Sequence, residues 1–152
     1  MADPAAVAAA REGRSSLDAY CRANPGKLDL SNADLSNAEL SGANLGNANL
    51  DGVDFSGANL EGVRFNSSSI RNANFSGANI NAVSFHKCDL TGSDLRAAAI
   101  QTWGMGEQRL CVSPQSFEGV HWSRDQLEGI LEMINLNPDW RVDWSISPRE
   151  AT

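Results

Sequence analysis

The most restrictive feature of this sequence is a strict period of five between residues 28 and 102. Every fifth residue from Leu30 onward is large and apolar, without exception: Leu30, Leu35, Leu40, Leu45, Leu50, Phe55, Leu60, Phe65, Ile70, Phe75, Ile80, Phe85, Leu90, Leu95 and Ile100. We call this position i. Two residues earlier, at position i−2, lies a second and mostly small residue, such as Ala33, Ala43 or Val53. The positions between are mostly Asn, Asp, Ser or Gly.

A straight helix or strand cannot bury such a pattern on one face. Five residues advance an α-helix by about 500°, so the apolar residues would spiral around it. In a flat strand, with its side-chain period of two, an odd repeat would send them to alternate faces. The chain must therefore turn once per repeat. Position i+2 is rich in Gly and Asn, which suit turns: Asn32, Asn37, Gly42, Asn47, Gly52, Gly57, Gly62, Asn72, Gly77 and Gly92.

The repeats 33–37 (ADLSN), 43–47 (ANLGN) and 58–62 (ANLEG) resemble the A-(D/N)-L-x-x consensus of the pentapeptide-repeat proteins. This resemblance implies an all-β solenoid, a right-handed quadrilateral β-helix whose turns close a coil of about twenty residues, with coils spaced roughly 4.8 Å apart. We expect about four coils over residues 28–102, between an N-terminal helical cap (1–27) and a C-terminal section (103–152), in a single domain. Ser68 and Ser93 depart from the pattern because they place hydroxyls inside, and Ser67–Ser69 are expected to form a weak spot.

The N-terminal residues predict a helical cap for the open end of the first coil. Asp3 and Pro4 are typical of a helix start, and Gly13 is expected to interrupt the helix. Ser15 with Asp18 can cap a second turn. Leu17, Tyr20 and Cys21 then share one face before 24–26 (NPG) ends the helix.

After Ile100 the period fails, and residues 103–114 are interpreted as a loop. Phe117 and Trp122 stand five apart and predict two degenerate repeats. A helix is expected to begin at Ser123 and to end at Asn137 and Pro138. An alternating strand is expected over 140–146, and the two elements together predict a C-terminal cap. The alternative is that this section also forms a homodimer or contacts a partner, through Leu127, Ile130, Leu131, Ile134, Trp140 and Trp144.

The formal net charge of −7 argues against direct, non-specific nucleic-acid binding. Residues 28–63 carry six acidic side chains and no Lys or Arg, whereas residues 64–102 are slightly basic because of Arg64, Arg71, Lys87 and Arg96. We expect the acidic side chains to form an interaction surface: Asp29, Asp34, Glu39, Asp51, Asp54, Glu61, Asp89 and Asp94.

No arrangement of residues in the sequence indicates catalysis, so we expect that the protein is not an enzyme and has no cofactor and no metal site. His86 and Cys88 have the spacing of a metal-ligand pair, but His86 should point outward and Cys88 inward. An odd, widely spaced set of three cysteines (Cys21, Cys88 and Cys111) favours a reducing cytoplasm. No apolar run approaches a membrane span, and the N-terminal residues lack the basic, apolar and cleavage-site pattern of a secretory signal, so we expect neither. The resemblance suggests a bacterial source.

Two functions follow from this reading. The first is a rigid scaffold that binds a protein partner of unknown identity. The second comes from the resemblance, because some pentapeptide-repeat proteins mimic DNA and bind DNA gyrase in quinolone resistance. A regular rod of about four coils is roughly 18 Å long, whereas one turn of duplex spans about 34 Å. Mimicry would therefore need a dimer joined through the C-terminal section.

Overall fold

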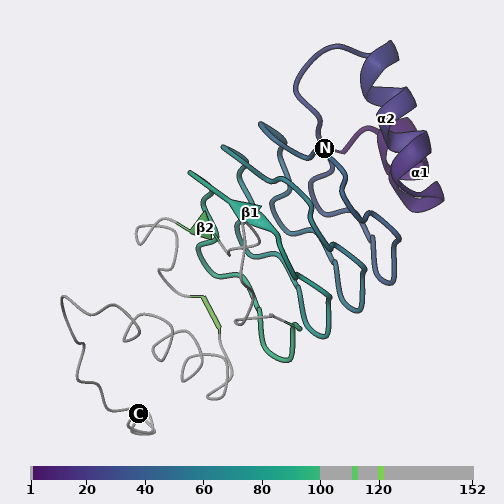
Figure 1. Cartoon of the computed structure of the whole chain (residues 1–152). Helices are drawn as coiled ribbons and strands as arrows, with labels where there is room; N and C mark the ends of the chain where they lie inside the picture. The colour runs from purple at the N-terminus through teal and green to yellow at the C-terminus, as the bar shows by residue number, and fades with distance from the viewer. Residues whose placement is uncertain (1, 100–110, 113–119, 122–152) are drawn as a thin grey trace, which may run out of the picture.

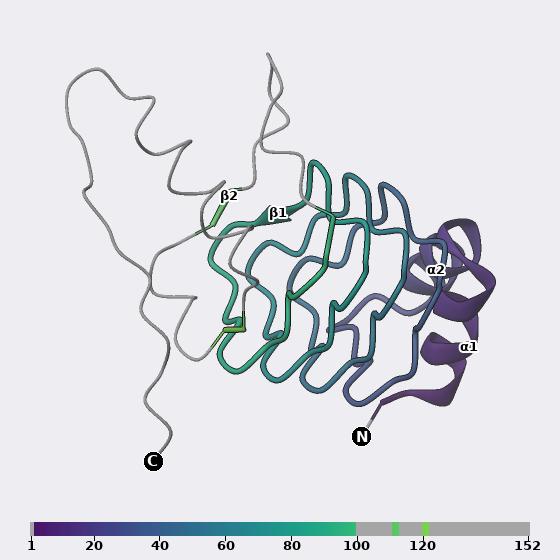
Figure 2. The same cartoon turned by 90° about the horizontal axis from the view of Figure 1, so that it is seen from below.

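The chain winds into coils stacked along one axis, with two helices covering the N-terminal end (Figures 1 and 2). This arrangement comes from a computed structural model, which describes residues 2–99, 111–112 and 120–121. The helices are α1 (Pro4–Glu12) and α2 (Arg14–Ala23), and the two short strands are β1 (Ser84–Phe85) and β2 (Cys111–Val112). The expected solenoid is therefore confirmed, although most of its backbone pairs through isolated bridges instead of long strands.

Residues twenty apart pair in parallel, which confirms the length of one coil. The paired residues form four rows along the rod, and we name the corresponding faces in chain order. The first face carries Asp29, Asn49, Ser69 and Asp89; the second Asp34, Asp54, Asn74 and Asp94; the third Glu39, Asn59, Asn79 and Ala99; and the fourth Asn44, Arg64 and Ser84. Side chains in one row are consequently held in register from coil to coil.

The core is built from the two apolar positions of each repeat. Every described residue at position i, from Leu30 to Leu95, is buried, and so is every described i−2 residue from Ala33 to Ala98. The corner follows at position i+2, where every residue from Asn32 to Ala97 has a positive φ. A positive φ at only the second central residue is typical of a type II turn, and the turns close with bonds such as Ala33 N–H to Leu30 C=O at 3.0 Å.

The phenylalanines confirm the register expected from the sequence. Phe55 stacks on Phe75 with ring centroids 5.3 Å apart, and Phe65 stacks on Phe85 at 5.2 Å. Edge-to-face contacts connect the two stacks, with Phe75 lying 6.1 Å from Phe65 and 5.8 Å from Phe85. All four rings are fully buried, so they form one aromatic cluster along the axis.

The buried hydroxyls of Ser68 and Ser93 are fully used. Ser68 Oγ donates to Leu45 C=O at 2.6 Å and accepts from Ala48 N–H at 2.9 Å. The hydroxyl thus lies between the Ala48 N–H and the Leu45 C=O, whose equivalents in most other repeats bond to each other directly. Ser93 Oγ does the same between Ile70 C=O and Ala73 N–H. No buried side-chain polar atom among the described residues lacks a partner, so the departures from the consensus leave no unsatisfied group.

The two N-terminal helices begin in different ways. Asp3 caps α1 by accepting from Ala5 N–H at 2.9 Å, as predicted. The second helix begins at Arg14, and its N-cap is Gly13, at φ +108°, with no side-chain bond. The prediction that Ser15 and Asp18 cap this helix is therefore wrong, because the helix has already begun at Arg14 and both residues lie inside it.

The cap donates hydrogen bonds to carbonyl groups of the first coil. Elsewhere in the rod, the equivalent carbonyl groups accept from the preceding coil. Asp3 N–H donates to Asp29 C=O at 3.1 Å, and Arg14 N–H donates to Glu39 C=O at 3.2 Å. The Arg11 guanidinium donates to Asp34 C=O at 2.8 Å. On three faces of the first coil, one backbone carbonyl thus accepts a bond from the cap. Ala6, Ala10 and Leu17 are buried in the same core as the repeats.

Beyond Ala99 the chain returns to the solenoid. β2 pairs in parallel with β1, with Cys111 opposite Ser84, and His121 pairs with Asp94. Both offsets are twenty-seven residues (111 − 84 and 121 − 94) instead of twenty, so seven residues are inserted before the next coil. The loop predicted over 103–114 is therefore wrong at Cys111–Val112.

Other expectations lie outside the described residues. They are Ile100, the repeats at Phe117 and Trp122, the helix and strand after Ser123, and the proposed dimer or partner residues Leu127, Ile130, Leu131, Ile134, Trp140 and Trp144.

Candidate interaction surface

The acidic side chains predicted to form a surface occupy the first three faces and the corners beside them. Asp29 and Asp89 belong to the first face, and Asp34, Asp54 and Asp94 belong to the second. Glu39 lies on the third face, whereas Asp51 and Glu61 are at the corners that follow the first and third faces. The fourth face carries no acidic residue in its described part.

Arginines pair with half of these carboxylates. Arg71 contacts Asp51 at 2.8 Å and Asp89 at 3.8 Å. Arg11 reaches from α1 to Asp34 at 3.1 Å, and Arg96 contacts Asp94 at 2.5 Å. The sequence alone did not indicate the Arg71 pairs, which depend on the twenty-residue coil, or the Arg11 pair, which depends on how α1 lies on the first coil. The Arg96–Asp94 pair is local, because the two residues are two apart in the chain. These pairs reduce the negative potential of the rod.

Hydrogen bonds hold several of these carboxylates in the charged form. The pKa of Asp34 is lowered by bonds from the Ser36 hydroxyl and backbone, and the pKa of Asp94 is lowered by the Arg96 guanidinium. For Asp51, burial acts to raise the pKa, but bonds from Arg71 and Ser69 outweigh it and the pKa is lowered.

Three candidates, Glu39, Asp54 and Glu61, form no ion pair among the described residues, and Glu39 and Glu61 are exposed. Asn59 Nδ2 donates to Glu39 at 3.0 Å, and Asn74 Nδ2 donates to Asp54 at 3.0 Å. These amide ladders fix the carboxylates without neutralising them. The unpaired acidic surface therefore consists of Glu39, Asp54 and Glu61.

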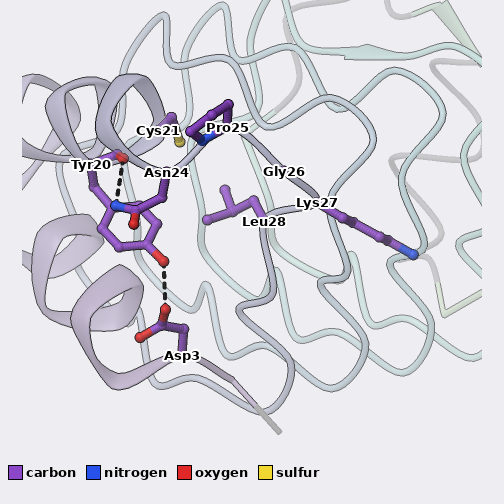
Figure 3. Close-up of a pocket in the computed structure, with 8 residues that line it drawn as sticks. All are labelled: Asp3, Tyr20, Cys21, Asn24, Pro25, Gly26, Lys27 and Leu28. Atoms are coloured by element: carbon purple, nitrogen blue, oxygen red, sulfur yellow. Dashed lines mark hydrogen bonds between the residues drawn. The ribbon is translucent and has the colours of Figure 1, made fainter.

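The cap and the first coil line a half-open pocket of about 350 Å³ (Figure 3). Tyr20 Oη donates to Asp3 at 2.5 Å, while Lys27 points away from the other lining side chains. Burial raises the pKa of the Cys21 thiol, which disfavours the reactive thiolate. Asp3, Tyr20 and Asn24 are joined by hydrogen bonds, and the pocket is best explained as part of the cap.

The expectation for His86 and Cys88 is confirmed, because His86 is exposed and Cys88 is buried. Burial also raises the pKa of the Cys88 thiol, and its Sγ lies 3.1 Å from Phe65 C=O. Within the described part of the chain, no group of three or more His, Cys, Asp or Glu side chains could hold a metal ion. None of its helices is both long and apolar enough to cross a bilayer.

Comparison with known proteins identifies the repeats. A family model described as pentapeptide repeats matches residues 29–66 and 58–96. A search of curated protein sequences found no match.

Solved structures similar to the chain are also pentapeptide repeat proteins. One is HetL of Nostoc sp. PCC 7120, described as involved in the regulation of heterocyst differentiation, at 20% identity over 62% of this chain and 48% of HetL, with a TM-score of 0.38. This chain therefore spans about half the length of HetL. A second, from the thylakoid lumen of Arabidopsis thaliana, shares 20% identity over 87% of this chain and 83% of its own, with a TM-score of 0.29. A third, QnrB1, is described as a plasmid-mediated fluoroquinolone resistance protein; it shares 18% identity over 77% of this chain and 68% of its own, with a TM-score of 0.21.

Proposed function

Because residues 29–96 belong to the pentapeptide-repeat family, we propose that the chain is a non-catalytic, cytoplasmic scaffold that presents fixed rows of polar side chains to a protein partner. The observation that carries this proposal is the register of the rows. Every coil bonds to the next through its backbone, and the amide ladders fix the outward side chains as well. Such a surface is pre-organised, so binding costs little side-chain ordering.

We place the first contact surface on Glu39, Asp54 and Glu61, which carry charge without an ion pair in the described structure. Carboxylates that are at least partly exposed and form no ion pair suit a partner with Lys or Arg side chains, through charge-assisted bonds. The C-terminal section remains a second proposed contact, either for the partner or for a homodimer.

The test is capture of bound proteins with purified chain and two matched variants. Asp54→Asn/Glu61→Asn removes two unpaired charges and introduces residues already present in the same rows, at Asn74 and Asn81. Glu12→Gln/Asp18→Asn removes two charges from the cap. We expect a bound protein to be lost with the first variant and kept with the second. A protein bound equally by both variants would refute the acidic surface, and the absence of any bound protein would refute the scaffold.

The alternative function, mimicry of DNA at gyrase, is supported by the row Asp34, Asp54 and Asp94 on the second face. It is less favoured because arginines pair with two of these three carboxylates. We therefore expect no inhibition of gyrase supercoiling and no protection from a quinolone. Inhibition or protection that disappears in Asp34→Lys/Asp54→Lys would instead establish the mimic.

A further inference from the structure

The fourth face differs from the other three in its hydrogen-bonding chemistry. On the first three faces, asparagine amides donate to a side-chain oxygen of the preceding coil, as Asn49 does to Asp29 and Asn79 does to Asn59. On the fourth face and the corner after it, the side-chain amides of Asn44 and Asn66 donate to no described group. Asn66 Oδ1 accepts from Ser84 Oγ at 2.6 Å, so the oxygen of this amide is used and its N–H groups have no described acceptor.

Within the described coils, the cations that form no ion pair gather in the same place. Four Lys or Arg residues lie in the described coils, and Arg71 and Arg96 are paired with carboxylates. Arg64 and Lys87 have no ion pair among the described residues, and both are exposed. His86, next to Lys87, is exposed as well. Together these form a donor surface on the fourth face and its corner: Asn44, Arg64, Asn66, His86 and Lys87.

The backbone places these residues on three successive coils. Arg64 pairs with Ser84 across one rung, and Ser67 N–H donates to His86 C=O at 2.9 Å at the corner. From the coil of Asn44 to the coil of Lys87 the rod rises two rungs, or roughly 10 Å. Alternate side chains of an extended peptide are spaced by about 7 Å. Two or three acidic side chains of such a peptide would therefore reach the donor surface together.

We propose that the donor surface binds an acidic segment of a partner protein. The proposal rests on the scaffold function and names a further contact, opposite in charge to the acidic surface of Glu39, Asp54 and Glu61. Positive donors without a carboxylate attract anionic groups and orient them. A short segment fits better than nucleic acid, because a duplex brings one charge per ~1.7 Å and would extend over the carboxylates of neighbouring faces, which repel it. Salt at physiological concentration screens charges beyond about 8 Å, so the carboxylates closest to the duplex would still repel it.

The variant Arg64→Asn/Lys87→Asn removes both positive charges and introduces a residue type that other repeats already have at the same positions. Asn occupies the ladder position of Arg64 in other repeats, at Asn44, Asn59 and Asn74. Lys87 has φ +57°, the same value as Asn47 two coils earlier in its own row, so Asn fits this backbone better than Lys does. The matched control Arg71→Ser/Arg96→Ser removes the same charge from other faces, and Ser is found in both rows, at Ser31 and Ser76. Circular dichroism and melting curves check that both variants fold.

The binding probes are a fluorescently labelled deca-glutamate peptide and a labelled 20-base-pair duplex, titrated at low salt and at 0.15 M salt. Amide chemical shifts of the isotope-labelled protein locate the peptide. We expect shifts at residues 44, 64, 66, 86 and 87, a loss of affinity of about tenfold or more in Arg64→Asn/Lys87→Asn, and a change of less than about threefold in the control.

With the purified protein, any of three results would overturn the proposal: equal losses in the two variants, tighter binding of the duplex than of the peptide, or self-association that the Arg64→Asn/Lys87→Asn variant abolishes. The last would identify a second copy of this chain as the occupant. A partner captured equally by the wild type and this variant would leave the scaffold intact and refute only the donor surface.

Discussion

Replacing Phe75 with Ala tests whether the aromatic cluster holds the coils together. Phe75 is fully buried, stacks on Phe55 and meets the edges of Phe65 and Phe85. A Phe→Ala change in such a site costs about 3–5 kcal/mol, because it removes apolar contact and leaves a cavity. A solenoid has no other core to compensate, since each coil contacts only its neighbours.

The measurement is urea unfolding followed by circular dichroism, together with thermal melting. The expected loss corresponds to a decrease in Tm of roughly 6–20 °C for a chain of this size. Phe75→Leu is the matched control, because Leu occupies position i in many repeats, and it should cost less than about 1.5 kcal/mol. An alanine variant as stable as the wild type, or a leucine variant as damaged as the alanine one, would refute the register.

A double-mutant cycle separates stacking from burial. Phe55→Leu and Phe75→Leu should show a coupling of about 0.5–1.5 kcal/mol, because the two rings stack at 5.3 Å. Phe55 and Phe85 have no ring contact in the structure, so the corresponding pair of variants should be close to additive. Equal coupling in both cycles would mean that the stabilisation comes from general core burial and not from the stacked pair.

Three further predictions concern the turns and the charges. Ser68→Ala should cost less than about 1 kcal/mol in urea unfolding, because the Ala48 turn can then close directly on Leu45 as other repeats do; a loss above about 3 kcal/mol would contradict this. Ala97→Gly should raise the unfolding free energy by about 0.5–1 kcal/mol, because Ala97 has φ +58° and the equivalent Gly77 accepts this conformation without strain. Asp51 has a lowered pKa, so its stabilisation should be present above about pH 4 and disappear as the pH falls through the folded-state pKa; melting curves between pH 6 and 2.5 should show a shallower acid decline in Asp51→Asn than in the wild type.

The core could be predicted from the sequence because a single period specifies it. Once the chain turns every five residues, positions i and i−2 must face inward, and the rings of Phe55 and Phe75 must meet one coil apart. The turn residues followed from the same count. Even Ala97, a poor turn former, adopts the positive φ of its row, because Ala98 N–H closes the turn on Leu95 C=O and Ala99 N–H bonds to Ala78 C=O of the previous coil.

The surface could be predicted only in part. The rows of acidic residues follow from the period, but the Arg71 pairs with Asp51 and Asp89 depend on side-chain directions across rungs. The seven-residue insertion before β2 was hidden because no apolar period continues through it. The start of α2 was misplaced because Gly13 begins a helix through its backbone alone, whereas the prediction looked for a capping side chain.

The charge pattern of the sequence ran along the rod, from acidic early coils to basic later ones, but the fold distributes charge around the rod as well. Arg71 and Arg96 lie beside carboxylates and lose much of their field, whereas Arg64 and Lys87 lie on the face that has no described carboxylate. Glu39 and Asp54 remain unpaired on the second and third faces. A rigid rod that keeps free anions on one side and free donors on another can hold two different segments at a fixed separation. Loss of one surface should therefore leave binding at the other unchanged, which distinguishes a bivalent scaffold from a single continuous interface.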